Sequence, residues 1–137
     1  MITKTAINAL TWAPTAARIL LGLVFFVFGL DGFLHFVPQP TTPPPAGAMA
    51  LGFALVKSGY LFQLIKGTEV VVGALLLCNR LVPLALALIA PVIVNIVAFH
   101  AFLAPEGLSI ALGVLVLEVY LAWHYRAVYR PMLAVRA

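Results

Sequence analysis

Four long stretches of apolar residues follow one another along the chain, and each is continuous rather than alternating. They cover about residues 14–37, 60–78, 81–103 and 108–126. Each is close to the roughly 20 residues that an α-helix needs to cross the hydrocarbon core of a bilayer. Strands of a membrane barrel would alternate between apolar and polar positions, so the pattern predicts spanning helices.

The breaks between these stretches carry turn-forming residues. Five prolines stand in the eight residues of "PQPTTPPP" at 38–45, and "CNR" and "APEG" mark the other two breaks. Residues 46–58 are apolar but too few to cross, so we expect a short interfacial or re-entrant helix there. The predicted fold is an all-α integral membrane protein: a four-transmembrane-helix bundle with a proline-rich outer loop, forming a single domain over residues 1–137.

Composition agrees with this pattern. Of the 137 residues, 64% are hydrophobic and 9% are charged, and the mean hydropathy is +1.14, which lies far outside the range of soluble domains. A signal peptide is the competing interpretation of the first stretch. Its length, the aspartate inside it and the lack of a small-residue site directly after it favour a membrane span. Four spans leave no room for a separate soluble catalytic domain.

Basic residues are predicted to gather on one side of the membrane, where six of them fall: Lys4, Arg18, Arg80, Arg126, Arg130 and Arg136. The other side has only Lys57. The positive-inside rule then predicts an inner (plasma) membrane protein with both termini in the cytoplasm. The net charge of +4 reflects this bias and attraction to anionic lipid, so nucleic acid is not an expected partner. A single cysteine, Cys78, excludes an internal disulfide and a paired-cysteine redox motif, and we expect a packed thiol.

Polar residues are concentrated in one layer of the predicted bundle, in the outer halves of the first three spans: Asp31, His35, Gln63, Lys66, Glu69, Asn95 and His100. Asp31 and His35 are four residues apart and share a helical face. Gln63, Lys66 and Glu69 follow at three-residue spacing and form one stripe. Asn95 and His100 differ by about 140° around an ideal helix, and Pro91 can change that angle. Such side chains normally face a bundle interior, a partner or water.

One acid lies apart from this layer. Glu118 is near the middle of the fourth span, and we expect it either to pair with Lys66 or Arg18 or to be neutral.

The layer has a structural and a functional interpretation. In the structural one, Asp31 pairs with Lys66 and Glu69 bonds to His100 or Asn95. Small residues would then allow the helices to approach closely, namely Gly22, Gly29, Gly32, Gly67 and Gly73. In the functional one, the layer is a site open to the outer side of the membrane.

Three segments resemble the successive helices of DoxX-type small membrane proteins: "ARILLGLVFFVFGLDGFLHF", "FALVKSGYLFQLIKGTEVVVGALLL" and "PLALALIAPVIVNIVAFH". The elements that carry the resemblance are Arg18 with Gly22, the segment from Gly29 to His35, "KGTE" and "NIVAFH". The resemblance covers almost the whole chain and implies a four-helix bundle. Some members are linked to quinone-dependent oxidation of sulfur compounds or to membrane-associated thiol redox complexes. The resemblance implies no list of catalytic residues.

The preferred function is an accessory or anchoring subunit of a membrane redox complex. The chain has no cysteine pair, flavin fingerprint or nucleotide loop, so we expect no catalysis by it alone and no intrinsic cofactor or metal. Membrane lipids and another membrane or peripheral redox subunit are the expected partners, and an oligomer is left open. The partner would dock on phenylalanines of the first span: Phe25, Phe26, Phe28, Phe33 and Phe36.

Two other functions are weighed against this one. In a quinone-binding or small-molecule-binding oxidoreductase component, Asp31, His35, Glu69 and His100 would bond and exchange protons with a headgroup in a cavity. A variant has His35 and His100 bind one b-type haem, which we rank low. A transporter of a small solute or proton ranks below the first two, because "VVVGALLL" after Glu69 is apolar.

Overall fold

A computed structural model describes residues 4–135, with side chains described from Thr11 to Val135. This part of the chain consists of helices and loops without a strand, which confirms the predicted all-α class. Three helical segments are long and apolar enough to cross a membrane: Thr11–Leu34, Val82–Phe102 and Pro105–His124. A bent pair of helices is a fourth candidate. Helices of this length and composition indicate a membrane protein.

The first helix, α1, covers Lys4–Leu34 and contains Pro14 in its interior. The helix therefore begins well before the apolar stretch predicted over about 14–37, and its part that could cross a membrane is Thr11–Leu34. A proline inside a helix removes one backbone donor, and the helix continues on both sides of it. The other end also differs, since the helix stops at Leu34 rather than residue 37. His35 has a φ of 52°, a left-handed conformation that an α-helix cannot continue through.

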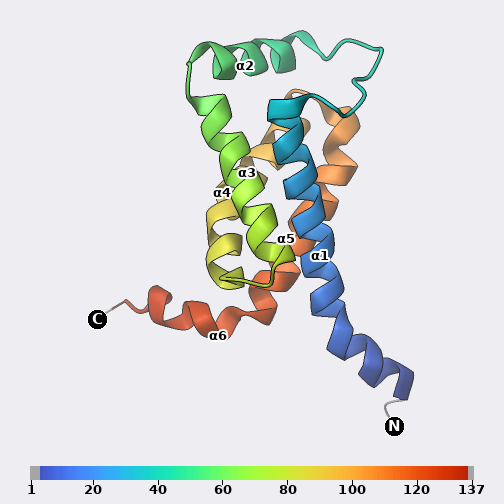
Figure 1. Cartoon of the computed structure of the whole chain (residues 1–137), viewed down its shortest axis with the longest axis vertical. Helices are drawn as coiled ribbons and strands as arrows, with labels where there is room; N and C mark the ends of the chain where they lie inside the picture. Colours follow the sequence, from blue (N-terminus) through green and yellow to red (C-terminus); the bar gives the residue numbers. More distant parts are fainter. Residues whose placement is uncertain (1–3, 136–137) are drawn as a thin grey trace.

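The next two helices form an angle rather than a line. α2 (Ala46–Lys57) lies across one end of the bundle, and α3 (Leu61–Leu77) descends from it at 92° (Figure 1). Gly59, between them, has a φ of 80°, which glycine adopts readily. The 17 residues of α3 span about 25 Å, less than the roughly 30 Å hydrocarbon core. α3 therefore counts as a candidate span only together with α2.

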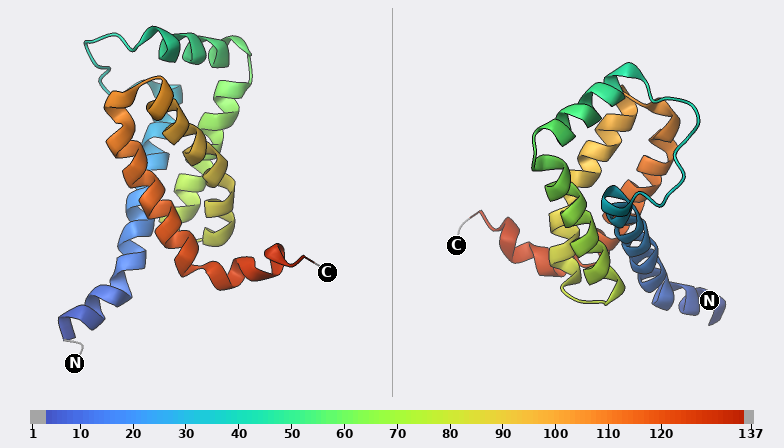
Figure 2. Two further views of the ribbon diagram at one scale, coloured as in Figure 1. Left: turned by 180° about the vertical axis from the view of Figure 1, so that it is seen from behind. Right: turned by 45° about the horizontal axis from the view of Figure 1, so that its top comes forward.

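The second half of the chain is a helical hairpin followed by a short tail. α4 (Val82–Phe102) is joined through the 3₁₀ turn η1 (Pro105–Gly107) to α5 (Leu108–His124). The tail consists of α6 (Arg126–Tyr129) and the 3₁₀ turn η2 (Arg130–Leu133), and it turns away from the bundle axis (Figures 1 and 2). α1 packs mainly against α3, and α4 packs mainly against α5.

The core lies where these two pairs meet, toward the α6 end. Its fully buried side chains include Leu21, Val72, Leu76, Leu86, Ile89 and Leu121. Cys78 is exposed in the turn after α3, so the expected packed thiol is wrong. The position follows α3 directly as its C-cap and therefore lies outside the packed helices.

Glycines bring α1 and α3 into close contact. A Cβ added at Gly73 would strike the backbone of Phe26, and one added at Gly29 would lie 2.8 Å from the backbone nitrogen of Val70. Four of the five glycines predicted at helix contacts do face a neighbouring helix: Gly22, Gly29, Gly32 and Gly73. Gly67 does not, because it lies on the face of α3 that points away from α1, with open space around it.

Candidate functional site

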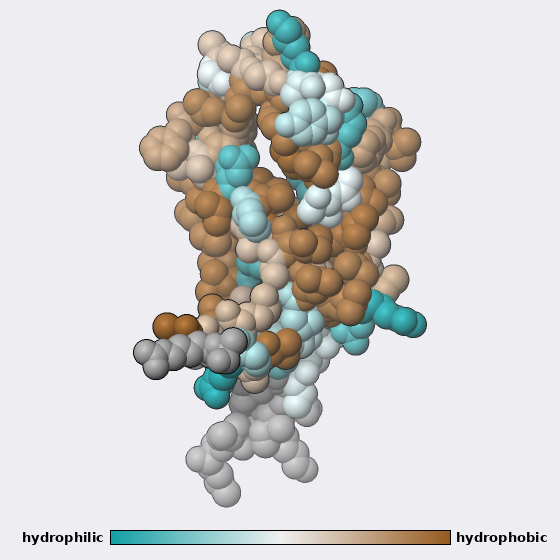
Figure 3. Space-filling view, turned by 90° about the vertical axis from the view of Figure 1, so that its left-hand side faces the viewer, coloured by the Kyte–Doolittle hydropathy of each residue, from teal (hydrophilic) through white to brown (hydrophobic). Residues whose placement is uncertain are grey.

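A cavity of about 410 Å³ lies between the two helix pairs at the α2 end of the bundle. Every helix from α1 to α5 contributes to its wall, and α2 forms its roof with Ala48, Leu51 and Leu55. Figure 3 shows the molecule hollowed at this end, with a mostly apolar surface around the opening. The volume is within the range of about 300–1,000 Å³ that small-molecule sites occupy.

The cavity is open to the side rather than sealed. Phe28 of α1 and Ile110 of α5 belong to its wall, yet they are 51% and 74% exposed. Both side chains would face lipid tails if α1 and α5 cross a membrane. A lipophilic molecule could then enter without passing through water.

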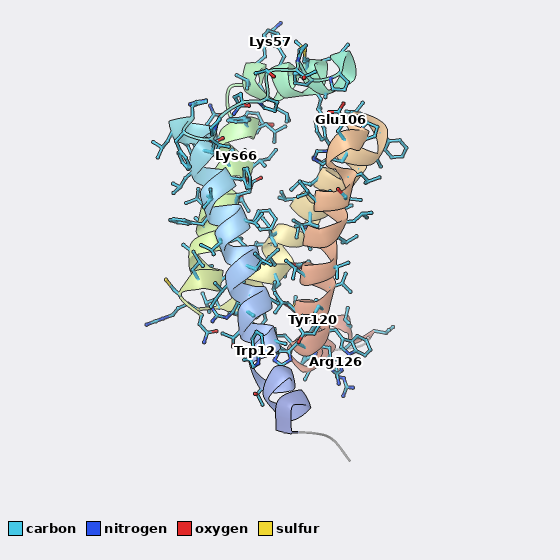
Figure 4. All side chains as sticks on the ribbon, turned by 90° about the vertical axis from the view of Figure 1, so that its right-hand side faces the viewer. Trp12, Lys57, Lys66, Glu106, Tyr120 and Arg126 are labelled. Atoms are coloured by element: carbon cyan, nitrogen blue, oxygen red, sulfur yellow. The ribbon has the colours of Figure 1, made fainter. Side chains whose placement is uncertain are left out.

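The α3 wall carries an ion pair. Lys66 Nζ donates to Glu69 Oε2 at 2.9 Å, one helical turn away, and the ammonium also reaches the Phe28 carbonyl at 3.4 Å. Glu69 is only 4% exposed. Because each charge has an opposite charge beside it, the pair adds polarity to the wall with almost no net charge. Figure 4 places Lys66 below α2, at the level where the helix pairs separate.

The α4 wall supplies two further polar groups, Asn95 and His100. His100 Nδ1 lies 2.9 Å from the Ala104 carbonyl oxygen. A carbonyl only accepts, so Nδ1 must carry the proton of this bond, which leaves Nε2 of a neutral ring as an acceptor. The ring also packs edge to face on Phe99, with centroids 5.1 Å apart. Despite their separation around the helix, both polar residues line one cavity.

Two glycines make room for these polar side chains. A Cβ at Gly32 would lie 2.5 Å from Cγ of Lys66, and a Cβ at Gly107 would collide with the His100 ring. Gly107 plays no part in the sequence prediction, because its role depends on a ring from another element. That α2 covers a cavity was likewise not predicted from the sequence, because this too depends on how separate elements pack together. Only its run of small and apolar residues after the prolines signals a surface that could cover another part of the fold.

The predicted polar layer is thus divided by the structure. Lys66, Glu69, Asn95 and His100 line the cavity, whereas Asp31, His35 and Gln63 do not. Asp31 accepts a 2.7 Å hydrogen bond from the backbone nitrogen of Val37 and so closes the end of α1. The expected pairing of Asp31 with Lys66 is wrong, since Glu69 takes that position on the same helix.

The other two residues outside the cavity are exposed. His35 follows the last turn of α1 and does not line the cavity that His100 lines. Gln63 lies beside a shallow groove on the outer face of α3. Of the three residues in the predicted stripe, Lys66 and Glu69 therefore line the cavity and Gln63 does not.

Two buried charged residues lie outside the cavity wall. Arg18 donates from Nη1 to the carbonyl oxygens of Leu76 and Leu77 at the end of α3. Glu118 is 6% exposed, and its Oε2 has no hydrogen-bond partner in the described part of the chain. Neither of the ion pairs predicted for Glu118 is formed, because Lys66 is bound to Glu69 and Arg18 to backbone.

The phenylalanines predicted to dock a partner are also divided. Phe25 is 2% exposed and belongs to the core, so it cannot dock a partner. Phe28, Phe33 and Phe36 are exposed. Phe25 and Phe28 are three residues apart on one face of α1 and both line the cavity, but Phe28 lies at the open side and Phe25 in the core.

Comparisons of the chain with models of protein families, with curated proteins and with solved structures found no match. Function must therefore be argued from the cavity itself. Its polar groups comprise the Lys66–Glu69 ion pair, the Asn95 amide and the acceptor nitrogen of His100, set in a wall that is otherwise apolar. This arrangement suits a flat, lipophilic molecule with polar atoms on opposite edges.

Proposed function

We propose that the chain crosses the membrane four times, with α3 as the second span and α2 lying in the outer interface. The distribution of charge supports this topology. Arg126 lies at the α6 end, whereas Lys57 and Glu106 lie at the α2 end (Figure 4). Arg130 directly follows α6, and Arg80 lies in the α3–α4 turn at the same end. Under the positive-inside rule the α6 end and both termini are cytoplasmic, and the cavity lies in the outer half of an inner membrane.

We propose further that the cavity binds a quinone and that the chain is the quinone-binding component of a membrane redox system. The observation that carries this proposal is a cavity open to the side whose apolar wall holds four polar groups, two from each helix pair. Lys66 and Asn95 would donate to the carbonyl oxygens of a quinone. His100 Nε2 would accept from a hydroxyl of the reduced form.

Electrons would come from a partner subunit. The side chains that line the cavity include no cysteine, and reduction of a quinone to a hydroquinone takes two electrons and two protons. A second subunit that oxidises a thiol or sulfur compound would supply both, in keeping with the resemblance to DoxX-type proteins. Phe28 and Phe33 of α1, together with Phe36 in the loop after it, offer it an exposed aromatic surface.

The experiment is a binding titration of a short-chain benzoquinone to the purified protein, followed by native mass spectrometry. We expect one bound quinone per chain, with about tenfold weaker binding in His100→Asn, because a hydrogen bond in an apolar site contributes about 1 kcal/mol or more. His35→Asn is the matched control, since it removes an exposed histidine and asparagine tolerates the left-handed conformation. Equal binding by both variants and the parent would contradict the assignment of the cavity.

A further inference from the structure

The tail of the chain forms a surface of mixed chemistry at the α6 end, which we call the tail surface. It consists of Trp123, Arg126, Val128, Arg130, Met132, Leu133 and Val135, all exposed. Trp123 stands in the last turn of α5, and the tail itself begins at Arg126, two residues after the candidate span ends at His124. Figures 1 and 2 show it leaving the bundle sideways rather than extending the line of α5.

Contacts with the bundle fix the direction of the tail. Tyr129 Oη donates to the Pro83 carbonyl oxygen at the start of α4, at 2.6 Å. Arg126 Nη1 donates to the Trp123 carbonyl oxygen at 2.9 Å, and its guanidinium lies 4.9 Å from the centre of the indole ring. The tail is therefore a built feature held across the end of the bundle.

The charged residues of the tail surface are all positive. Residues 119–135 contain two arginines and no acidic residue, and Arg80 is exposed in the α3–α4 turn at the same end. Glu118 precedes this segment but is buried. Exposed apolar side chains beside arginines, at the level where a span ends, match a segment that lies in the membrane interface.

We propose that the tail surface docks on anionic phospholipid of the membrane that surrounds the bundle. Met132, Leu133 and Val135 enter the upper part of the acyl chains, and Arg126 and Arg130 contact the phosphates. A basic residue at an anionic membrane surface contributes about 1 kcal/mol, which is roughly fivefold in affinity. Removing both arginines is expected to weaken binding of an anionic lipid about 25-fold.

Lipid titrations of the full-length protein in uncharged detergent, read by native mass spectrometry, test this proposal. We expect phosphatidylglycerol to bind more tightly than phosphatidylcholine, and the preference to disappear in the double variant Arg126→Gln/Arg130→Gln. Lys57→Gln is the control, because it removes an exposed positive charge at the opposite end and should keep the preference. Equal binding of the two lipids, or an equal loss in Lys57→Gln, would overturn the proposal.

A second measurement locates the tail in a bilayer. In Trp12→Phe, Trp123 is the single tryptophan, and brominated phosphatidylglycerol in vesicles should quench it more strongly than brominated phosphatidylcholine. Inorganic phosphate at millimolar concentration should not relieve the quenching. Relief by phosphate would mean a site for a free anion, and absence of quenching would mean that the surface faces water or an acidic protein; either result rejects the lipid assignment.

Discussion

Replacing Gly73 by alanine should force α1 and α3 apart. The new Cβ would lie 2.7 Å from Cα and 2.8 Å from Cβ of Phe26, whereas ordinary contact begins at 3.4 Å. The helices would have to separate by roughly 1 Å, because backbone atoms cannot rotate out of the way. Overpacking of this kind costs about 1–3 kcal/mol.

The matched control lies in the same helix. Gly67 has no atom within 4 Å of an added Cβ, so Gly67→Ala changes helix propensity without a collision. Alanine is favoured over glycine by up to about 1 kcal/mol in a helix interior. Both variants share this gain, so the difference between them isolates the collision.

The assay is reversible unfolding in mild detergent by titration with dodecyl sulfate, followed by circular dichroism. We expect Gly73→Ala to be about 1–3 kcal/mol less stable than Gly67→Ala. Equal stability of the two variants, within about 0.5 kcal/mol, would refute the close packing of α1 on α3 at this position.

Three further substitutions probe the polar groups, each by the same unfolding titration. Glu69→Gln leaves the Lys66 ammonium without its partner, so we expect a loss of about 1–3 kcal/mol; an unchanged midpoint would show that the pair does not form. Glu118→Leu removes a buried oxygen that has no hydrogen-bond partner in the described structure, so stability should stay level or rise by about 1 kcal/mol; a loss of several kcal/mol would reveal a partner for the carboxyl group. Tyr129→Phe should loosen the tail by about 1 kcal/mol, through loss of the bond to Pro83. The pKa of Tyr129 is raised, chiefly by burial and then by the nearby Glu118. The stability contributed by the hydrogen bond is therefore complete below about pH 10 and is lost as the pH rises further. Trp123 emission that is the same in parent and variant across this pH range would contradict this prediction.

The position of a residue along its helix could be predicted from the sequence, whereas the direction of its side chain around that helix could not. The apolar stretches predicted helices, and the position of Lys66, Glu69, Asn95 and His100 along those helices predicted that they share a level. Which of the polar residues meet depends on how each helix is rotated by its packing.

Local backbone structure added further differences. The left-handed residue His35 ends α1 early and puts its own side chain outside the bundle. Asp31 is used by the turn that follows, through a bond to a backbone nitrogen six residues away. Neither the end of the helix at His35 nor the hydrogen bond of Asp31 changes the spacing of apolar and polar residues. Spacing alone therefore could not show that Asp31 and His35 lie apart from the other polar residues of the predicted layer.

Both members of the ion pair beside the cavity belong to α3, and this has a mechanical consequence. When the α1–α3 pair moves relative to the α4–α5 pair, the distance between Lys66 and Glu69 need not change. Widening the cavity therefore leaves the Lys66–Glu69 contact intact and instead separates apolar side chains of the two helix pairs. The cavity can therefore accommodate ligands of different size while the arrangement of charges in its wall stays the same.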